Sequence, residues 1–445
     1  MSDRYDLILR SGTVLTPNGR QQIDIGVRGG RVAALGLPAS AEAAEVIDCT
    51  GLHVLPGVID SQCHFREPGL EHKEDLATGT LGAIKGGVTA IFEMPNTKPS
   101  TTTPEAIADK VARAKGRAWC DHAFFIGAAP DNADDLGAWE TLPGCAGVKI
   151  FMGSSTGSLL VEQDAVIARV LASGRRRVAV HCEDEERLRE RKPLADEGAH
   201  PRFHHVWRDP ETALRATKRL VTLAEAARRR VHVLHVTTAQ EIQFLKDHKD
   251  LVTVEVLPQH LTLTADAYET LGTLAQMNPP IREKDHQDML WWGIAQGVVD
   301  VIGSDHAPHT LEEKAQTYPA SPSGMTGVQT LVPIMLDHVA AGRLTLERFV
   351  DLTSAGPARV FGIAGKGRVA VGYDADFTLV DLNARRTIEN AWIASRCGWT
   401  PFDGKTVTGW AVATVIRGTV VMRDDEVIGA PLGRPVRFQE CYPEG

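Results

Sequence analysis

The middle of the chain alternates short apolar runs with amphipathic stretches. Stretches of helical periodicity, such as 76–86, 104–115, 210–228 and 286–297, separate most of the apolar runs. Strands that alternate with helices are typical of a parallel sheet, and eight repeats favour an α/β fold closed into a (β/α)8 TIM barrel. The eight predicted strands are 54–60, 88–94, 122–127, 146–151, 178–182, 231–236, 252–257 and 298–303.

The two ends of the chain carry a different pattern. Residues 5–53 and the segment from about 366 to 432 alternate apolar with polar positions and are punctuated by glycine, as half-buried β-strands are. A strand-rich piece of about 50 residues would bury little core alone. We therefore predict one small composite, β-sandwich-like domain from residues 1–53 and 366–445, and a barrel domain from residues 54–365.

Composition excludes several classes of protein. The net charge of −9 argues against a nucleic-acid partner. No run approaches the 18 or so apolar residues that span a bilayer, and the N-terminus lacks a secretory signal, so no membrane association is expected. The seven cysteines form no C-x-x-C pair, which fits reduced thiols and a cytoplasmic location.

Five residues of metal-ligand type stand at the ends of different predicted strands: His64, Lys149, His181, His235 and Asp305. The carboxyl ends of barrel strands meet at one mouth, and imidazole and carboxylate groups suit zinc. A single histidine at a strand end is more often a structural residue, and a lysine is more often ion-paired. The shared placement of all five favours a metal site at the barrel mouth.

The segment DSQCHFREPG at 60–69 resembles the D-x-H-x-H-[LF]-R-[DE]-P-G opening of dihydroorotases, within the cyclic amidohydrolases. The resemblance covers nearly the whole chain, and that family has a (β/α)8 barrel with a small composite β-domain. Further matching motifs are HKEDLATGT (72–80), GGVTAIFEMPNTKP (86–99), GVKIFMG (147–153), HCED (181–184), LHVTTA (234–239), LPQHL (257–261), NPPIR (278–282), SDHAPH (304–309), SGMTGVQT (323–330), GPARVFG (356–362) and CGWTPFDG (397–404).

The resemblance implies a role for each metal-ligand residue. Lys149 would be carbamylated by CO2 and would bridge two zinc ions. His181 and His235 would hold the more exposed ion, and His64 would help to hold the more buried one. Asp305 would be both a ligand and the general base, although an N-cap role is the plain alternative for an aspartate at this position.

A second set of residues is implied to bind the substrate. Arg66 follows His64 by two positions, and its guanidinium suits bidentate binding of a carboxylate. By resemblance Arg66, Asn96, Asn278 and His309 hold the carboxylate and the ring. The alternatives are a surface ion pair for Arg66 and turn positions for the two asparagines. The Gly/Ser/Pro-rich piece 318–328 is predicted to be a mobile loop at the mouth.

Two positions depart from the family pattern. Gln62 stands where the first histidine of H-x-H is expected, and an amide oxygen is a weak ligand beside imidazole. The outcomes left open are two metals with a weakened first site, one metal held mainly by His181, His235 and modified Lys149, or a catalytically silent relative. Gln259 stands where the family often has histidine, and the sequence assigns it no consequence.

The leading hypothesis is a dihydroorotase that interconverts N-carbamoyl-L-aspartate and (S)-dihydroorotate in pyrimidine biosynthesis, with a small-molecule substrate and one or two zinc ions. A hydantoinase- or allantoinase-type cyclic amidohydrolase is the second hypothesis. The third is a non-catalytic, dihydroorotase-like partner of aspartate transcarbamoylase, which Gln62 keeps open. The resemblance also implies a homo-oligomer, a dimer or a tetramer.

Overall fold

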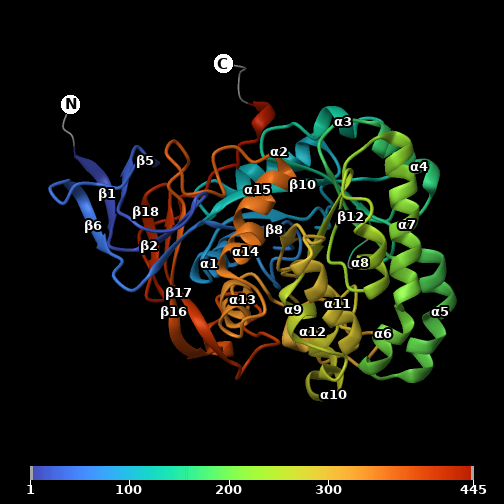
Figure 1. Cartoon of the computed structure of the whole chain (residues 1–445). Helices are drawn as coiled ribbons and strands as arrows, with labels where there is room; N and C mark the ends of the chain where they lie inside the picture. The colour runs from blue at the N-terminus through green and yellow to red at the C-terminus, as the bar shows by residue number, and fades with distance from the viewer. Residues whose placement is uncertain (1–3, 156, 158, 442–445) are drawn as a thin grey trace.

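Eight parallel strands form a nearly closed barrel at the centre of the molecule, within the helices (Figure 1). The computed structural model describes residues 4–155, 157 and 159–441. The strands lie in sequence order around it, which confirms the predicted (β/α)8 barrel. They are β8 (Val58–Cys63), β9 (Val88–Glu93), β10 (Asp121–Gly127), β11 (Cys145–Phe151), β12 (Val178–His181), β13 (Val231–Val233), β14 (Val252–Val256) and β15 (Val301–Ile302).

The barrel strands are buried on both faces, as parallel strands covered by helices must be. Every residue of β9, β10 and β11 is buried. Inside the barrel, Phe92 and Phe125 pack edge to face, with ring centroids 6.0 Å apart. Phe361 and Phe438 contact Phe92 from below, at 5.4 and 5.9 Å. These rings fill the bottom of the barrel, so that polar side chains are left for the opposite end.

Helices cover the outside of the barrel, and several begin at strong capping residues. Asp75 accepts a hydrogen bond from Thr78 N (2.8 Å) in a capping box, and Asp209 caps α7 just before Pro210. The helices are α1 (Leu76–Lys85), α2 (Pro104–Ala114), α3 (Leu136–Trp139), α4 (Asp164–Ala172), α5 (Glu185–Gly198), α6 (His204–Trp207), α7 (Pro210–Ala227), α8 (Ala239–Leu245), α9 (Pro258–Thr262), α10 (Ala267–Leu271), α11 (Lys284–Ala295), α12 (Leu311–Lys314), α13 (Leu331–Ala340), α14 (Leu346–Val350) and α15 (Gly356–Phe361).

Two further sheets lie beside the barrel, and the larger of them combines strands from the N-terminal and C-terminal parts of the chain (Figure 1). Leu7, Val54, Phe377 and Val415 are among the buried residues that these sheets share as a core. One sheet has the order β5-β4-β1-β6 and the other β19-β18-β17-β16-β7-β2-β3. The strands are β1 (Tyr5–Arg10), β2 (Thr13–Thr16), β3 (Gly19–Gln22), β4 (Ile25–Arg28), β5 (Arg31–Leu35), β6 (Ala43–Asp48), β7 (His53–Pro56), β16 (Phe377–Thr387), β17 (Thr406–Ile416), β18 (Thr419–Arg423) and β19 (Glu426–Val427).

The predicted first barrel strand, 54–60, is wrong as a single element. His53–Pro56 forms β7 and pairs with β16 of the small sheet, whereas the barrel begins at Val58. The chain turns at Gly57, where a Cβ atom would lie 2.3 Å from Thr89 Oγ1. The apolar run therefore crosses from one sheet to the other. The division into domains at 53/54 and 365/366 stays a prediction.

Two expectations from composition can be compared with the described residues. Six described cysteines, at positions 49, 63, 120, 145, 182 and 397, are buried free thiols. Among the helices of the described part of the chain, none combines the length and the apolar character that crossing a membrane requires.

A buried ion cluster links the bottom of the barrel to the small sheets. Lys366 Nζ lies 2.7 Å from Asp121 and 3.4 Å from Asp374, and it also pairs with Asp376. Burial lowers the pKa of Lys366, but the three carboxylates outweigh burial and raise that pKa above its usual value. Arg417 also pairs with Asp121, and Arg437 with Asp374 at 2.7 Å, so Lys366 is the cation on which Asp376 depends.

We predict that Lys366→Met lowers the free energy of unfolding by about 3–5 kcal/mol at pH 8, because it leaves the buried Asp376 carboxylate without its cation. At pH 5 the loss is smaller, since an unpaired carboxylate takes up a proton and loses its charge. Denaturant unfolding at both pH values measures this, with exposed Lys246→Met as the control. An equal, small effect of the two variants at pH 8 contradicts the prediction.

Candidate active site

A narrow polar pocket lies at the carboxyl ends of the barrel strands. It brings together residues from Gln62 to Gly324, and nearly all of the predicted site residues line it. The lining residues are Gln62, His64, Arg66, Asn96, Lys149, His181, His235, Asn278 and Asp305, with Phe151, Ser155, Ala307, Ser323 and Gly324.

Three pocket residues adopt a left-handed backbone that residues other than glycine seldom adopt. The φ angles are 64° at Arg66, 37° at His235 and 45° at Asp305. Each such residue costs about 1–3 kcal/mol and persists only where its surroundings hold it. The strain turns these side chains from the strand direction into the pocket.

His181 and His235 face each other across one side of the pocket, with His181 Nδ1 3.0 Å from His235 Nε2. His181 Nε2 donates to Glu183 at 2.9 Å, so Nδ1 carries a lone pair. Burial lowers the pKa of both imidazoles, which keeps them neutral near pH 7. His235 Nδ1 is buried and has no hydrogen-bond partner among the described residues.

His64 and Asp305 form a second facing pair. His64 Nδ1 donates to Asn96 Oδ1 at 2.7 Å, which leaves the Nε2 lone pair 3.0 Å from Asp305 Oδ1. Two acceptors at this distance need a cation or a proton between them. Gln62 Nε2 donates to the same carboxylate oxygen at 3.2 Å, and Gln62 Oε1 is buried without a partner in the described structure. Gln62 thus presents its amide donor to Asp305.

Lys149 lies in β11, and its charge helps to lower the pKa of His64, His181 and His235. Its Nζ lies 4.4 Å from the ring centre of Phe151. Burial lowers the pKa of Lys149 to about 7, with the nearby Asp305 and Glu255 opposing the shift. A large share of this amine is therefore neutral at pH 7.

The donor set can be tested against a divalent ion. Zinc–nitrogen distances of about 2.0–2.1 Å place two nitrogen ligands of one ion about 3.3 Å apart, close to the separation of His181 Nδ1 and His235 Nε2. However, among residues 4–155, 157 and 159–441 no three His, Cys, Asp or Glu side chains converge as a complete metal site. The residues fit an ion only if a further anionic ligand is supplied.

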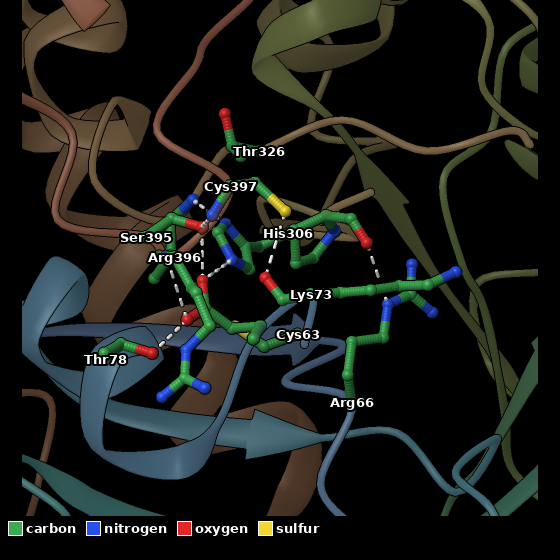
Figure 2. A network of polar contacts seen from close by, with 12 residues as sticks. Cys63, Arg66, Lys73, Thr78, His306, Thr326, Ser395, Arg396 and Cys397 are labelled. Carbon is green, nitrogen blue, oxygen red and sulfur yellow. Dashed lines mark hydrogen bonds and ion pairs between the residues drawn. The ribbon is translucent and has the colours of Figure 1, made fainter. Parts of the chain in front are cut away.

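Arg66 provides a cationic group in the wall of the pocket, and its side chain is labelled in Figure 2. Its Nε donates to Pro308 O at 3.1 Å, and its Nη2 lies 3.2 Å from His309 Nε2. Its Nη1 is buried and has no partner among the described residues. Burial lowers the pKa of Arg66 to about 10, so that the guanidinium stays charged at neutral pH. This group is positioned to receive an anion.

The remaining predicted substrate-binding residues occupy two kinds of position. Asn278 lines the pocket, and its Oδ1 accepts from His204 Nε2 at 2.9 Å. His309 lies behind Arg66 and is not among the lining residues. Lys73 Nζ lies 3.0 Å from His309 Nδ1, and His309 Nε2 lies between Arg66 Nη2, at 3.2 Å, and Ser323 O, at 3.0 Å. His309 therefore touches Arg66, which lines the pocket, and does not line the pocket itself.

Sequence reasoning missed Glu183 and the use made of Gln259. Glu183 receives hydrogen bonds from His181 and Arg208. Burial raises the pKa of Glu183, but Arg208 and His181 outweigh burial and lower it to about 2. A carboxylate two positions after a ligand-type histidine was the available signal, since such groups orient metal-binding imidazoles. Gln259 Nε2 donates to Ser304 O at 2.8 Å, beside Asp305.

The segment 318–328 is packed into the mouth and is not the free loop that we predicted. Ser321, Met325 and Thr326 are buried. Lys314 Nζ donates to Pro322 O at 2.9 Å and Gly324 O at 3.1 Å, and to Gln276 O at 3.0 Å. Because Ser323 and Gly324 line the pocket, Lys314 fixes part of the pocket wall.

Comparisons with known proteins agree with this architecture. The profile of the amidohydrolase family matches residues 53–421. The chain is 36% identical to a dihydroorotase of Halobacterium salinarum, over 93% of this chain and 96% of the relative. It is 33% identical to an allantoinase of Salmonella newport, over 94% and 95%. It also superposes on the solved L-hydantoinase (dihydropyrimidinase) of Arthrobacter aurescens, with a TM-score of 0.92 and 30% identity over 97% of this chain and 99% of that chain.

We predict that Lys314→Met makes backbone amides of 318–328 exchange about tenfold faster and lowers the free energy of unfolding by about 2–4 kcal/mol, because it leaves three carbonyl oxygens without their donor. Hydrogen–deuterium exchange measures the first effect. Exposed Lys284→Met is the control. Unchanged exchange in this segment would show that Lys314 does not hold it.

Proposed function

The chain belongs to the amidohydrolase family, and from this premise we propose that it opens and closes the ring of a cyclic amide that carries a carboxylate. The proposed enzyme is a dihydroorotase, which interconverts (S)-dihydroorotate and N-carbamoyl-L-aspartate in pyrimidine biosynthesis. A cytoplasmic location and a homodimer or homotetramer remain predictions.

One observation carries the choice of substrate: Arg66 has a buried Nη1 without a partner among the described residues, in the wall of the pocket. A buried, charged donor is costly unless an anion meets it. Dihydroorotate brings a carboxylate, whereas hydantoin, allantoin and dihydrouracil have none on the ring. The unpaired guanidinium donor therefore favours dihydroorotate over the substrates of hydantoinase- and allantoinase-type enzymes.

The amidohydrolase family is generally metal-dependent, and the donor set here supports one main ion. His181 and His235 would hold it, and carbamylated Lys149 would supply the anionic ligand that the unmodified set lacks. In carbamylation the neutral amine nitrogen bonds to the carbon of CO2 and loses a proton. His64 and Asp305 are the proposed ligands on the other side, with zinc the first choice for imidazole and carboxylate donors. Zinc bound there supplies Lewis acidity, which polarises a carbonyl and makes water more acidic.

Asp305 is the proposed general base and acid. As water adds to the ring carbonyl carbon, a carboxylate oxygen of Asp305 accepts the water proton, and the same proton then passes to the amide nitrogen as the C–N bond breaks. One carboxylate serves both steps because the proton gained in the first is needed in the second. Arg66, Asn96 and Asn278 hold the substrate, and His309 acts through Arg66.

A non-catalytic partner of aspartate transcarbamoylase remains the alternative from another class, because Gln62 replaces a ligand. The retained arrangement of His181, His235, Glu183 and Asp305 favours an enzyme, since a scaffold has no need of strained residues around a polar pocket. Turnover decides between the two.

We predict turnover of dihydroorotate and N-carbamoyl-L-aspartate, and little or none of hydantoin, allantoin or dihydrouracil. Arg66→Met should lower kcat/KM for dihydroorotate about 100-fold, because charged hydrogen bonds to the carboxylate are lost. Exposed Arg189→Met should have no effect. Preference for an uncharged ring, with Arg66→Met still fully active, would count against the proposed substrate.

We predict that Gln62→His raises the zinc content per chain, from about one ion toward two, because imidazole is a stronger ligand than an amide. Elemental analysis of purified protein measures this, with exposed Gln243→His as the control for adventitious binding. Two ions at full occupancy in the natural protein would show that our account of Gln62 is wrong.

A further inference from the structure

His306, which follows Asp305, is held from four directions. Its N–H donates to Ser304 Oγ at 3.0 Å, and its carbonyl accepts from His64 N at 2.7 Å. Its Nδ1 accepts from Gly327 N at 3.0 Å and Val328 N at 3.3 Å. The side chain is 1% exposed. The backbone and the side chain of His306 are therefore both fixed by hydrogen bonds.

These contacts fix the tautomer of His306. Because Nδ1 faces two backbone donors, it carries the lone pair, and the proton is on Nε2. Nε2 then donates to Glu74 Oε2 at 3.3 Å. The ring also packs edge to face on Phe65, with centroids 5.4 Å apart. Glu74 therefore receives the one polar hydrogen of this imidazole.

Glu74 is fully buried and is itself held from three elements of the chain. Thr78 Oγ1 of α1 and Ser395 Oγ donate to its two oxygens, and Arg396 N lies 3.3 Å from Oε1. Figure 2 shows Thr78, Ser395 and Arg396 gathered on one side of His306. The contact between Glu74 and Ser395 spans 321 positions. The C-terminal segment is thus tied to the residue after Asp305.

The same segment also supports the far end of the 305–309 loop. Trp399 Nε1 donates to His309 O at 2.8 Å, and Thr326 Oγ1 donates to Trp399 O at 2.6 Å. Asp305 keeps a φ of 45°, which needs such support. A general base must hold its position closely, because a misplacement of about 1 Å can cost about 100-fold in rate.

We propose that Glu74 and His306 are positioning residues that hold the strained backbone of Asp305 in its productive orientation, with the segment 395–399 as their support. Neither side chain lines the pocket, so both act through Asp305 and through the backbone of His64. This inference rests on the proposed role of Asp305 as the base.

The test is a double-mutant cycle of Glu74→Gln and His306→Asn. Asn Oδ1 can replace Nδ1 as the acceptor for Gly327 N, so His306→Asn removes mainly the contact with Glu74. Each single variant should lower kcat for dihydroorotate about 10- to 100-fold, with KM within about threefold. The double variant should be no slower than the slower single variant within about threefold, because the two residues act as one unit.

Exposed Glu190→Gln on α5 is the control and should match the natural protein. Hydrogen–deuterium exchange of the peptide 303–309 gives a readout that needs no substrate: both single variants should exchange at least about tenfold faster there. If the natural protein turns over no cyclic amide, the proposed function fails, and exchange still tests the pair. Effects on kcat that multiply, or kcat and exchange both like the natural protein, would overturn the proposal.

Discussion

The seam that closes the barrel is the constraint on which the site depends. In the described structure β8 and β15 are the two ends of the sheet order, joined by one bridge between Cys63 and His306. Side chains complete the closure: Asp60 accepts from Ser304 N at 3.0 Å, and Ser304 Oγ donates to Gln62 O at 3.4 Å. Gln62, His64 and Asp305 all lie on this seam. The contacts that close the fold are therefore the contacts that place the proposed base.

Electrostatics and strain act together at this seam. Burial keeps His64, His181 and His235 neutral, so their lone pairs are available as ligands. The facing acceptors His64 Nε2 and Asp305 Oδ1, and one unpaired guanidinium donor, then leave the pocket with two unmet needs, a cation between the acceptors and an anion beside Arg66. A metal ion and a substrate carboxylate would meet both. The strained φ at Asp305 persists because its neighbours are fixed from several elements.

Much of this was accessible from the sequence. Apolar runs predicted eight barrel strands, and their ends brought His64, Lys149, His181, His235 and Asp305 to one pocket. The turn at Gly57 was missed because the apolar pattern continues through it. The close approach of Thr89 to Gly57 explains why the chain leaves β7 there and enters the barrel at Val58. The direction of the Gln62 amide depends on Asp305, 243 positions away. Glu74 and Ser395 are even farther apart in sequence, by 321 positions. A local sequence pattern does not predict contacts over such separations.

The central claim is that neutral imidazoles, Asp305 and a modified Lys149 converge on a divalent ion. Anomalous X-ray scattering from crystals of protein purified without chelators tests it most directly. We expect a strong zinc signal between His181 Nδ1 and His235 Nε2, with carbamate density on Lys149. A fully folded protein with no anomalous signal among these side chains and an unmodified Lys149 would contradict the account.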